Sequence, residues 1–418
     1  MAQYVAKRIR FKNGEHFSIL KGPDGLPVHA VTLFLQKWRR RGRAANTIHS
    51  VCQCLALLYR ELDTAPRIDL LARVRAGNFL SSSELNRLAD VAQYAMDGLS
   101  HEDEPEMGKQ VINLKNVRMR RSKQSNAGKP VGKANHANRI RYMAEYLGFV
   151  ANYYAASLSR PLRQQLVQES GEALKSFLTQ VPKVSKRARL GAREGLSQED
   201  QEKLLAVVDV TSHKNPWKRG FVRNRNRVIV MLLLATGMRS GELLGLQIGD
   251  LKTQLSQLGV FRRADAIEDP RTAPVNTKTN DREIELRPAI MQALMEHIRM
   301  DRNRIRAARK FPQVFVAQDG QPLSLRSIGK IFQQLRTACP GLPVRLTSHV
   351  MRHTWNERFS EEADRLGLTE EEEIRARNEQ QGWADNSKSS LIYTRRNTRR
   401  KGRAVALKLQ EKLDGPNI

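Results

Sequence analysis

An apolar run in the second half of the chain, VIVMLLLA at 228–235, constrains the fold more than any other stretch. Because it is apolar on every side of a helix, it predicts a helix that is buried all round. Gly237 follows the run and suits the left-handed residue that ends such a helix. Ser240 is expected to cap a second helix, with Glu242 in its first turn.

Arg239 lies between these two expected helices. An arginine is nearly always charged and is rarely buried without a partner, so we expect Arg239 to have an anionic partner. An ion pair with Glu242 or Asp250 is one interpretation. The other is an anionic ligand, which backbone N–H groups at the start of a helix also attract. This stretch alone leaves both open.

The charge balance restricts the class of partner. The 418 residues include 72 Lys and Arg against 43 Asp and Glu, a net charge of +29. A charge this large favours binding to a polyanion, with nucleic acid the first candidate and an anionic membrane surface the second. No apolar run approaches the roughly 18–20 residues of a membrane span, and the start MAQYVAKRIRF lacks the apolar centre of a signal peptide. We therefore expect a cytoplasmic, nucleoid-associated protein.

The three cysteines do not indicate a metal site. Cys52, Cys54 and Cys339 are odd in number and lack metal-type spacing, and the first two lie within a helical pattern. They are expected to be small apolar residues in a reducing compartment.

Four segments are expected along the chain. Residues 1–27 predict an N-terminal hairpin or arm, because RIRFKNGEHFSIL alternates around a two-residue turn signal at Asn13-Gly14. Residues 28–180 predict a helical domain, 181–195 a basic linker, and 196–418 a catalytic domain with a C-terminal tail. A polar, basic stretch at 115–133 is expected to be a loop or extended arm, with a solvated insertion and direct DNA contact equally open.

Helical periodicity dominates both halves of the chain. Asn46 is expected to cap one helix, and a second is predicted by the apolar spacing of Ile140, Met143, Leu147, Val150 and Tyr154. Later helices are expected to start at Ser197 and Thr369. One strand pair is expected, APVNTKT with REIELRP, around Asn280-Asp281. The fold class is therefore mainly α, with a helical DNA-binding domain and a mixed α/β catalytic domain that carries a small antiparallel sheet.

Two further segments carry groups that suit phosphate chemistry. In TSHVMRHTWNERF, His349 and Arg352 are three residues apart and share a helix face. In QQGWADNSKSSLIYTRRN, Trp383 is followed ten residues later by Tyr393, with Arg395 and Arg396 close behind. A tyrosine near a chain end is usually a surface residue, and only accompanying phosphate-binding groups make it a candidate nucleophile.

These segments, in this order, resemble the tyrosine recombinase (phage integrase) family. The family's first motif, an arginine in an ATGxRxxEL setting, is matched by ATGMRSGELLGL at 235–246. Its second, His-x-x-Arg-His, is matched by HVMRH at 349–353, and its third by GWADNSKSSLIY at 382–393 with one extra residue. The family's catalytic lysine lies on a β-hairpin between the first two motifs, where NTKTNDREIEL offers Lys278.

The resemblance covers 196–400 well and 28–180 more loosely, with extra residues relative to the family at QLGVFRRADAIEDPR. It implies a site-specific DNA recombinase or integrase that cuts and rejoins strands through a 3′-phosphotyrosyl bond. Its substrate would be double-stranded DNA with specific recombination sites, and it would belong to a mobile genetic element or a chromosome-maintenance system. A homotetramer on DNA is implied, with accessory DNA-bending or directionality proteins as candidate partners.

The resemblance also assigns roles to the candidate residues. Arg239 and Arg352 would bind the phosphate, Tyr393 would be the nucleophile, His349 the base and Lys278 the acid. Trp383 would donate its indole N–H to a phosphate oxygen, with a plain core residue as the alternative, whereas His353 is expected to be a packing residue. No metal or cofactor is expected.

Clusters of basic residues are the candidate phosphate contacts along the duplex. They are Lys37, Arg39, Arg40, Arg41, Arg43, Lys186, Arg187, Arg395 and Arg396. The apolar positions in GRAVALKLQEKL are expected to pack on a neighbouring subunit or on their own domain. Two other activities stay open: a type IB topoisomerase-like enzyme, and a catalytically silent DNA-binding regulator with the same fold.

Overall fold

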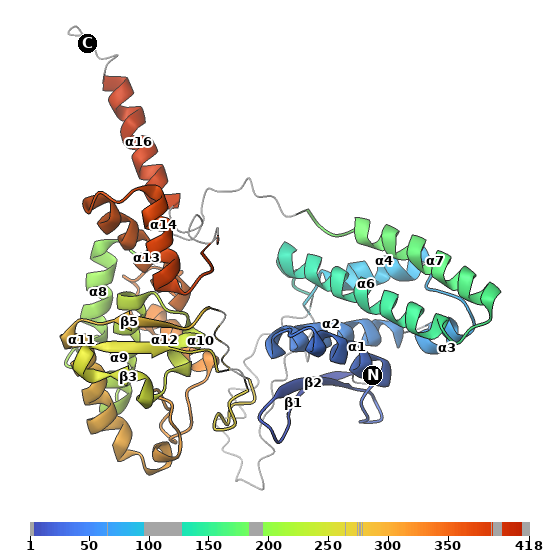
Figure 1. The fold of residues 1–418 in the computed structure, drawn as a ribbon, viewed down its shortest axis with the longest axis horizontal. Helices are drawn as coiled ribbons and strands as arrows, with labels where there is room; N and C mark the ends of the chain where they lie inside the picture. The colour runs from blue at the N-terminus through green and yellow to red at the C-terminus, as the bar shows by residue number, and fades with distance from the viewer. Residues whose placement is uncertain are drawn as a thin grey trace. The chain divides into compact units, whose positions relative to one another are not determined.

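The computed structural model describes residues 4–64, 66–95, 128–183, 195–263, 265–273, 275, 277, 279–385, 387 and 395–411. The chain divides into two compact units, Met1–Arg187 and Ala188–Ile418, each with its own apolar core (Figure 1). The division falls within the expected linker 181–195, of which 184–194 lie outside the described residues. Most of the expected basic insertion, residues 115–127, also lies outside them.

The N-terminal unit begins with an antiparallel hairpin of β1 (Val5–Arg10) and β2 (His16–Lys21), in which Arg10 lies opposite His16. The expected two-residue turn is wrong. The Gly14 N–H donates to Phe11 O at 3.0 Å, and the Phe11 N–H donates to Glu15 O at 2.8 Å. Gly14, at φ +89°, supplies the left-handed residue of this longer, bulged turn.

Helices form the rest of the N-terminal unit. They are α1 (His29–Arg40), α2 (Ala45–Leu62), α3 (Leu70–Arg75), α4 (Ser82–Ala92), α6 (Lys133–Ala155) and α7 (Arg160–Thr179). The helix predicted from the spacing of Ile140 and Leu147 is α6, and both side chains are fully buried. The cap expected at Asn46 is wrong, because α2 starts one residue earlier and the Asn46 Oδ1 accepts a hydrogen bond from Arg8 Nη1 at 2.9 Å.

The C-terminal unit is also mainly helical. Its α-helices are α8 (Gln198–Val208), α9 (Gly220–Thr236), α10 (Ser240–Gly245), α11 (Pro288–Glu296), α12 (Leu325–Ala338), α13 (Ser348–Arg365), α14 (Glu370–Gln381) and α16 (Arg395–Glu411). Short helical turns are η1 (Ile248–Asp250), η2 (Thr253–Leu255), η3 (His297–Asp301), η4 (Arg302–Arg304) and η5 (Arg306–Lys310). Ser197 and Thr369 cap α8 and α14 as the sequence predicts. None of the helices in the described ranges combines the length and apolarity that a membrane crossing requires.

A small antiparallel sheet packs with these helices, in the order β3 (Leu251–Lys252), β4 (Gln257–Val260) and β5 (Arg282–Glu285). The segment REIE alternates between buried and exposed, as predicted, but its expected pairing with 273–279 is wrong. Its partner is β4, where Leu258 lies opposite Ile284 and both side chains are buried. Burying this apolar pair decides the register.

The start of the C-terminal unit is tied to helix α13. The Gly195 N–H donates to Glu357 Oε1, and the Leu196 N–H donates to Thr354 Oγ1, both at 2.8 Å. A Cβ on Gly195 would lie 2.6 Å from the Thr354 Cα, so only glycine allows this approach. The chain thus enters the unit directly against the helix that carries His349 and Arg352.

Candidate active site

The site is organised around the C-terminal end of the buried helix α9. Gly237 has φ +62°, so it ends the helix in the left-handed conformation that the sequence predicts. A Cβ there would lie 2.8 Å from the Trp355 ring. Both the backbone angle and the close ring therefore require glycine.

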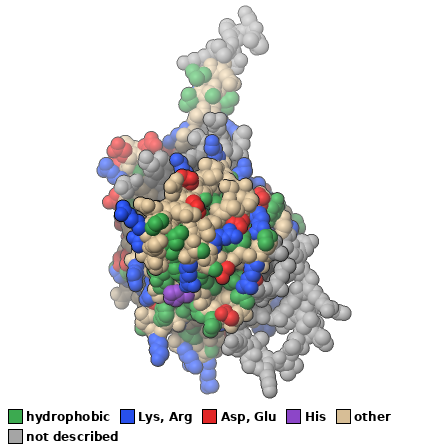
Figure 2. All heavy atoms as spheres, turned by 90° about the vertical axis from the view of Figure 1, so that its right-hand side faces the viewer, with side chains coloured by type: hydrophobic (Ala, Val, Ile, Leu, Met, Phe, Trp, Pro, Cys, Tyr) green, Lys and Arg blue, Asp and Glu red, His purple; other side chains and the backbone are tan. Residues whose placement is uncertain are grey.

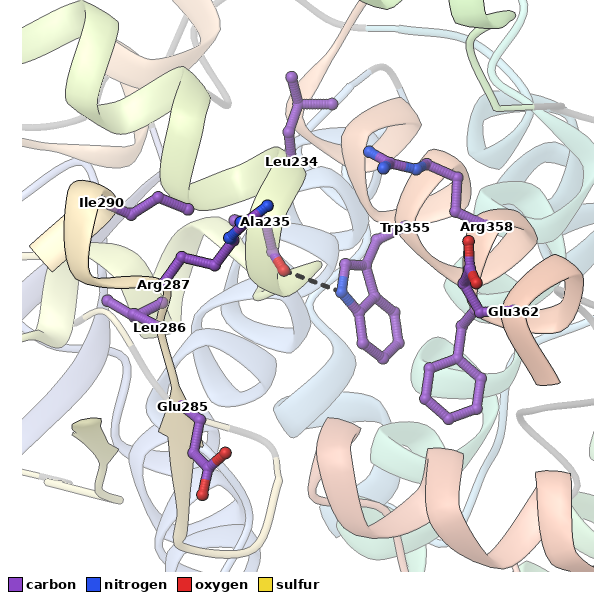
Figure 3. A pocket seen from close by; sticks show the side chains of 10 residues that line it. Leu234, Ala235, Glu285, Leu286, Arg287, Ile290, Trp355, Arg358 and Glu362 are labelled. Atoms are coloured by element: carbon purple, nitrogen blue, oxygen red, sulfur yellow. Dashed lines mark hydrogen bonds between the residues drawn. The ribbon is translucent and has the colours of Figure 1, made fainter. Parts of the chain in front are cut away.

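The last three carbonyls of this turn accept hydrogen bonds from segments that lie far away in the sequence. Trp355 Nε1 donates to Ala235 O at 3.0 Å (Figure 3). Gln381 Nε2 donates to Thr236 O at 3.1 Å, and Arg352 Nη1 donates to Gly237 O at 2.8 Å. A helix leaves these carbonyls without partners inside it. Satisfying them from α13 and α14 brings the three segments singled out in the sequence to one place.

The two candidate arginines lie in different environments. Arg239 immediately precedes α10, and its side chain is 34% exposed. Arg352 is buried on α13, and its guanidinium carbon lies 5.1 Å from the centre of the Trp383 ring. Trp383 itself is buried. The Trp383 indole thus makes a cation–π contact with the Arg352 guanidinium, whereas the Arg239 guanidinium reaches solvent.

Glu242 bonds directly to Arg239 and is affected by the charge of Arg352. Its carboxylate accepts from the Arg239 backbone N–H at 3.0 Å and from Arg239 Nη1 at 3.2 Å. Burial raises the pKa of Glu242, but the Arg282 guanidinium, with Arg352 and the Arg239 N–H, holds that pKa below its usual value. The ion pair between Arg239 and Glu242 weighed from the sequence is therefore present.

Other expectations at this turn are wrong. Asp250 pairs with Arg263 and not with Arg239. Ser240 is the first residue of α10 and not its cap, and its hydroxyl donates to Ser348 Oγ at 2.7 Å. The Glu242 carboxylate satisfies the backbone N–H at this helix start instead.

Sequence reasoning missed two buried partners of Glu242. Thr279 Oγ1 donates to Glu242 Oε1, and Arg282 Nη2 donates to Glu242 Oε2, both at 2.8 Å. The only signal for Arg282 was a charged residue at a position of the strand that alternation places inward.

The two histidines of HVMRH stack edge to face, with ring centres 4.7 Å apart. His349 is exposed at the start of α13, whereas His353 is buried one turn later. His349 is therefore accessible to a substrate, and His353 packs as the sequence predicts.

Several candidates have no described side chain. Lys278, Tyr393, Lys186 and Arg187 lie outside the described residues. Arg395 and Arg396 begin helix α16, but only their backbone is described.

The remaining basic candidates are exposed at the end of α1 and just after it. They are Lys37, Arg39, Arg40, Arg41 and Arg43. Arg39 pairs with Glu15 and Arg41 with Glu145, the latter at 3.5 Å. On the face seen in Figure 2, basic side chains are interspersed with acidic and apolar ones.

No group of three or more His, Cys, Asp or Glu side chains suited to a metal ion occurs among the residues that the structure describes. The chemistry that the described site offers is cationic: two guanidiniums lie at the α9 turn, and an exposed imidazole lies one turn before Arg352 on α13.

Comparison with known proteins agrees with these motifs. A model of the phage integrase family matches residues 196–400, which include the α9 turn, the HVMRH segment and Trp383. Residues 196–400 belong to the phage integrase, or tyrosine recombinase, family.

Two curated members of this family are similar in sequence. Tyrosine recombinase XerD of Halalkalibacterium halodurans is 26% identical over 241 residues, 57% of this chain and 69% of its own length. Tyrosine recombinase XerC of Bacillus pumilus is 27% identical over 197 residues, 46% of this chain. The alignment spans about half of the XerC chain, 54%.

Solved structures with a similar chain include two recombinases bound to DNA. The integrase of transposon Tn1549 with circular intermediate DNA is 16% identical, with a TM-score of 0.47 over 87% of this chain and 94% of its own. The XerH recombinase bound to palindromic difH substrate is 18% identical, with a TM-score of 0.45 over 90% of this chain and 94% of its own.

Proposed function

We propose that this chain is a site-specific DNA recombinase that cuts and rejoins duplex DNA through a 3′-phosphotyrosyl bond to Tyr393. Family membership supports DNA strand transfer. The observation that carries the proposal is the position of Arg239 and Arg352 at one helix turn: Arg239 directly follows that turn, and the Gly237 carbonyl within it accepts a hydrogen bond from Arg352 Nη1.

The two guanidiniums suit the charge of the reaction. A phosphodiester already carries one negative charge, and the pentacoordinate transition state gathers more on its non-bridging oxygens. Arginine remains protonated and offers a planar fork of donors to such oxygens. Arg352 is held in place by its bond to Gly237 O and by the Trp383 ring, which favours donors that are already oriented for the transition state.

Proton transfers complete the scheme. The Tyr393 hydroxyl loses its proton as its oxygen attacks phosphorus, and exposed His349 takes that proton. The bond from phosphorus to the 5′-oxygen breaks, and the 5′-oxygen receives a proton from Lys278. The reverse sequence with the 5′-hydroxyl of another strand rejoins the DNA. Trp383 lines the pocket and supplies an indole N–H.

Binding and assembly follow from the same proposal. The chain would bind a duplex in the cytoplasm, with the exposed basic residues at the end of α1 and just after it on phosphates. A homotetramer on DNA is supported by α16, where Val405, Leu407 and Leu409 are each about 60% exposed. It is also supported by a cavity of about 400 Å³ beside Trp355 and Phe359 (Figure 3), which offers an apolar surface for such a helix from another copy.

A nicked suicide substrate tests the chemistry. The nick lets the short cleaved strand diffuse away, so a covalent protein–DNA adduct accumulates and is counted on a denaturing gel. We expect an adduct with the wild-type chain and none with Tyr393→Phe, at unchanged DNA affinity. Tyr153→Phe, at an exposed tyrosine of α6, is the matched control. An adduct that survives Tyr393→Phe places the nucleophile elsewhere.

Two further readouts separate the alternative activities. A catalytically silent regulator gives no adduct with the wild-type chain. A topoisomerase-like enzyme forms the adduct and relaxes supercoils but joins no strand to a second DNA molecule. Recombinant product between two site-bearing DNAs is the result that we expect, and a chelator of divalent ions is expected to leave the adduct yield unchanged.

A further inference from the structure

We propose that Arg282 is a positioning residue: together with Glu242 it holds Thr279, the residue next to Lys278, beside the turn that carries Arg239. This inference rests on the proposed function, in which Lys278 protonates the leaving oxygen. It assigns to β5 a role beyond packing. Arg282 on this strand, with its partners Glu242 and Thr279, forms a clamp that joins three segments of the candidate site.

Arg282 makes three hydrogen bonds to three different segments. Its Nη2 donates to Glu242 Oε2 at 2.8 Å, its Nε to Gln380 O at 2.9 Å, and its Nη1 to Thr279 Oγ1 at 3.1 Å. The side chains of Arg282 and Glu242 are 2% and 0% exposed. One planar group thus joins the arginine turn, the end of α14 and the residue next to Lys278.

A second contact closes the same junction. The Asn280 N–H donates to Gly382 O at 2.8 Å. Gly382 has φ +61°, and a Cβ there would lie 2.7 Å from Asn280 O and 3.0 Å from Arg282 Nη1. The Gly-Trp segment therefore lies directly against the residues that follow Lys278, with no room for a side chain between them.

The energetics favour a positioning role over a stabilising one. Removing two charges from water costs several kcal/mol per ion, and a well-packed apolar pair of similar volume is often as stable as a buried ion pair. Apolar side chains at both 242 and 282 would fill this inward space beside β5 without that cost. What an apolar side chain cannot provide is a fork of donors in set directions. Arg282 provides that fork, and Glu242 supplies the matching charge.

Thr279 connects this clamp to Lys278, the expected acid. One peptide bond joins Thr279 to Lys278, and the Thr279 hydroxyl is held between Arg282 Nη1 and Glu242 Oε1. Glu242 also holds Arg239. The expected acid and a phosphate-binding arginine therefore share one anchor, and loosening it at Arg282 is expected to disturb the transfer of the proton before it disturbs DNA binding.

The test compares two leaving groups at the scissile phosphate. With an ordinary substrate, the bond from phosphorus to the 5′-oxygen breaks and that oxygen takes a proton from Lys278. With sulfur in place of the 5′-oxygen, the bond from phosphorus to sulfur breaks and a thiolate leaves without a proton, because thiols are far more acidic than alcohols. A defect in placing the acid slows only the first substrate.

We expect Arg282→Lys to slow single-turnover cleavage of the oxygen substrate about 10²-fold, as loss of general acid catalysis typically does. On the sulfur substrate we expect a rate within about threefold of the wild type, and the same pattern for Lys278→Ala. DNA affinity is expected to be unchanged. Arg299→Lys, at an exposed arginine of η3, is the matched control and is expected to cleave both substrates at the wild-type rate.

Thr279→Val provides the test if Arg282→Lys unfolds, since valine keeps the shape of threonine and replaces only the hydroxyl, with a methyl group. A smaller slowing, about tenfold, on the oxygen substrate with recovery on sulfur supports the clamp. Equal slowing on both substrates, or no slowing on either, overturns the inference. A wild-type chain that cleaves neither substrate overturns the proposed function instead.

Discussion

The two units of the chain differ in what they bury. In the N-terminal unit, the buried polar side chains among the described residues are His16, Ser18, His49 and Ser170, and none is a Lys, Arg, Asp or Glu. The C-terminal unit buries nine charged side chains among its described residues. They are Arg225, Glu242, Asp250, Arg271, Arg282, Arg302, Arg352, Glu357 and Arg377.

Under the proposed function, this difference corresponds to two kinds of DNA contact. Buried charges are costly, so a unit that keeps them must bond them to defined partners and becomes locally rigid. The C-terminal unit does this around the α9 turn, where donors need set directions. The N-terminal unit keeps Arg and Lys on its surface, where they suit phosphates whose positions vary along a duplex.

The largest effect is expected from removing a buried arginine of the site. Arg352→Ala should lower the cleavage rate about 10²–10³-fold, because a directed donor to the transition state is lost. DNA affinity should change far less, as measured by titration against the cleavage rate. Arg365→Ala, at an exposed arginine near the end of the same helix, is the control. An equal loss of binding and cleavage would make Arg352 an ordinary contact.

A smaller effect is expected from the buried imidazole of the N-terminal unit. Burial, with the nearby Arg8, lowers the pKa of His49 to about 4, and Ser18 Oγ lies 3.0 Å from its Nδ1. The unfolded value is about 6.5. The unfolded state thus binds the proton more readily, so the stability present above pH 6.5 is lost as pH falls toward 4.

That loss should reach at most about 3 kcal/mol across this pH window. It is measured as the difference in free energy of unfolding between the wild type and His49→Gln, each followed from pH 7 to pH 4. A constant difference would show that His49 takes up its proton at the same pH in the folded and unfolded chain. The folded unit would then hold a buried charge at low pH, which would break the contrast with the C-terminal unit.

The smallest effect on stability is expected at the surface. Arg40→Ala should change the free energy of unfolding by less than about 0.5 kcal/mol. If Arg40 neutralises one phosphate, the slope of log affinity against log salt should fall by about 0.9. A titration at several salt concentrations measures this slope, and an unchanged slope removes Arg40 from the DNA contacts.

Local patterns in the sequence predicted the elements that depend on near neighbours. The buried helix α9, its stop at Gly237 and the caps at Ser197 and Thr369 follow from apolar runs and residues within one turn. The pairing of β5 with β4 did not, because it depends on an apolar contact between Leu258 and Ile284, far apart in sequence.

The candidate site was predictable in its motifs but not in its connections. HVMRH and ATGMRSGEL pointed to Arg352 and Arg239, yet nothing local revealed that Arg282 bonds Glu242 across 40 positions. Asn46 and Ser240 failed as caps for a related reason. Their polar atoms bond to Arg8 and Ser348, partners that only the tertiary fold supplies.

A structure of the chain bound to its recombination site is the measurement that decides most. The Arg239 and Arg352 guanidiniums should lie within hydrogen-bond distance of one scissile phosphate, with the Tyr393 hydroxyl in line opposite the 5′-oxygen. If both guanidiniums instead bond only to carboxylates and the hydroxyl points away in every subunit, this chain does not perform the proposed reaction.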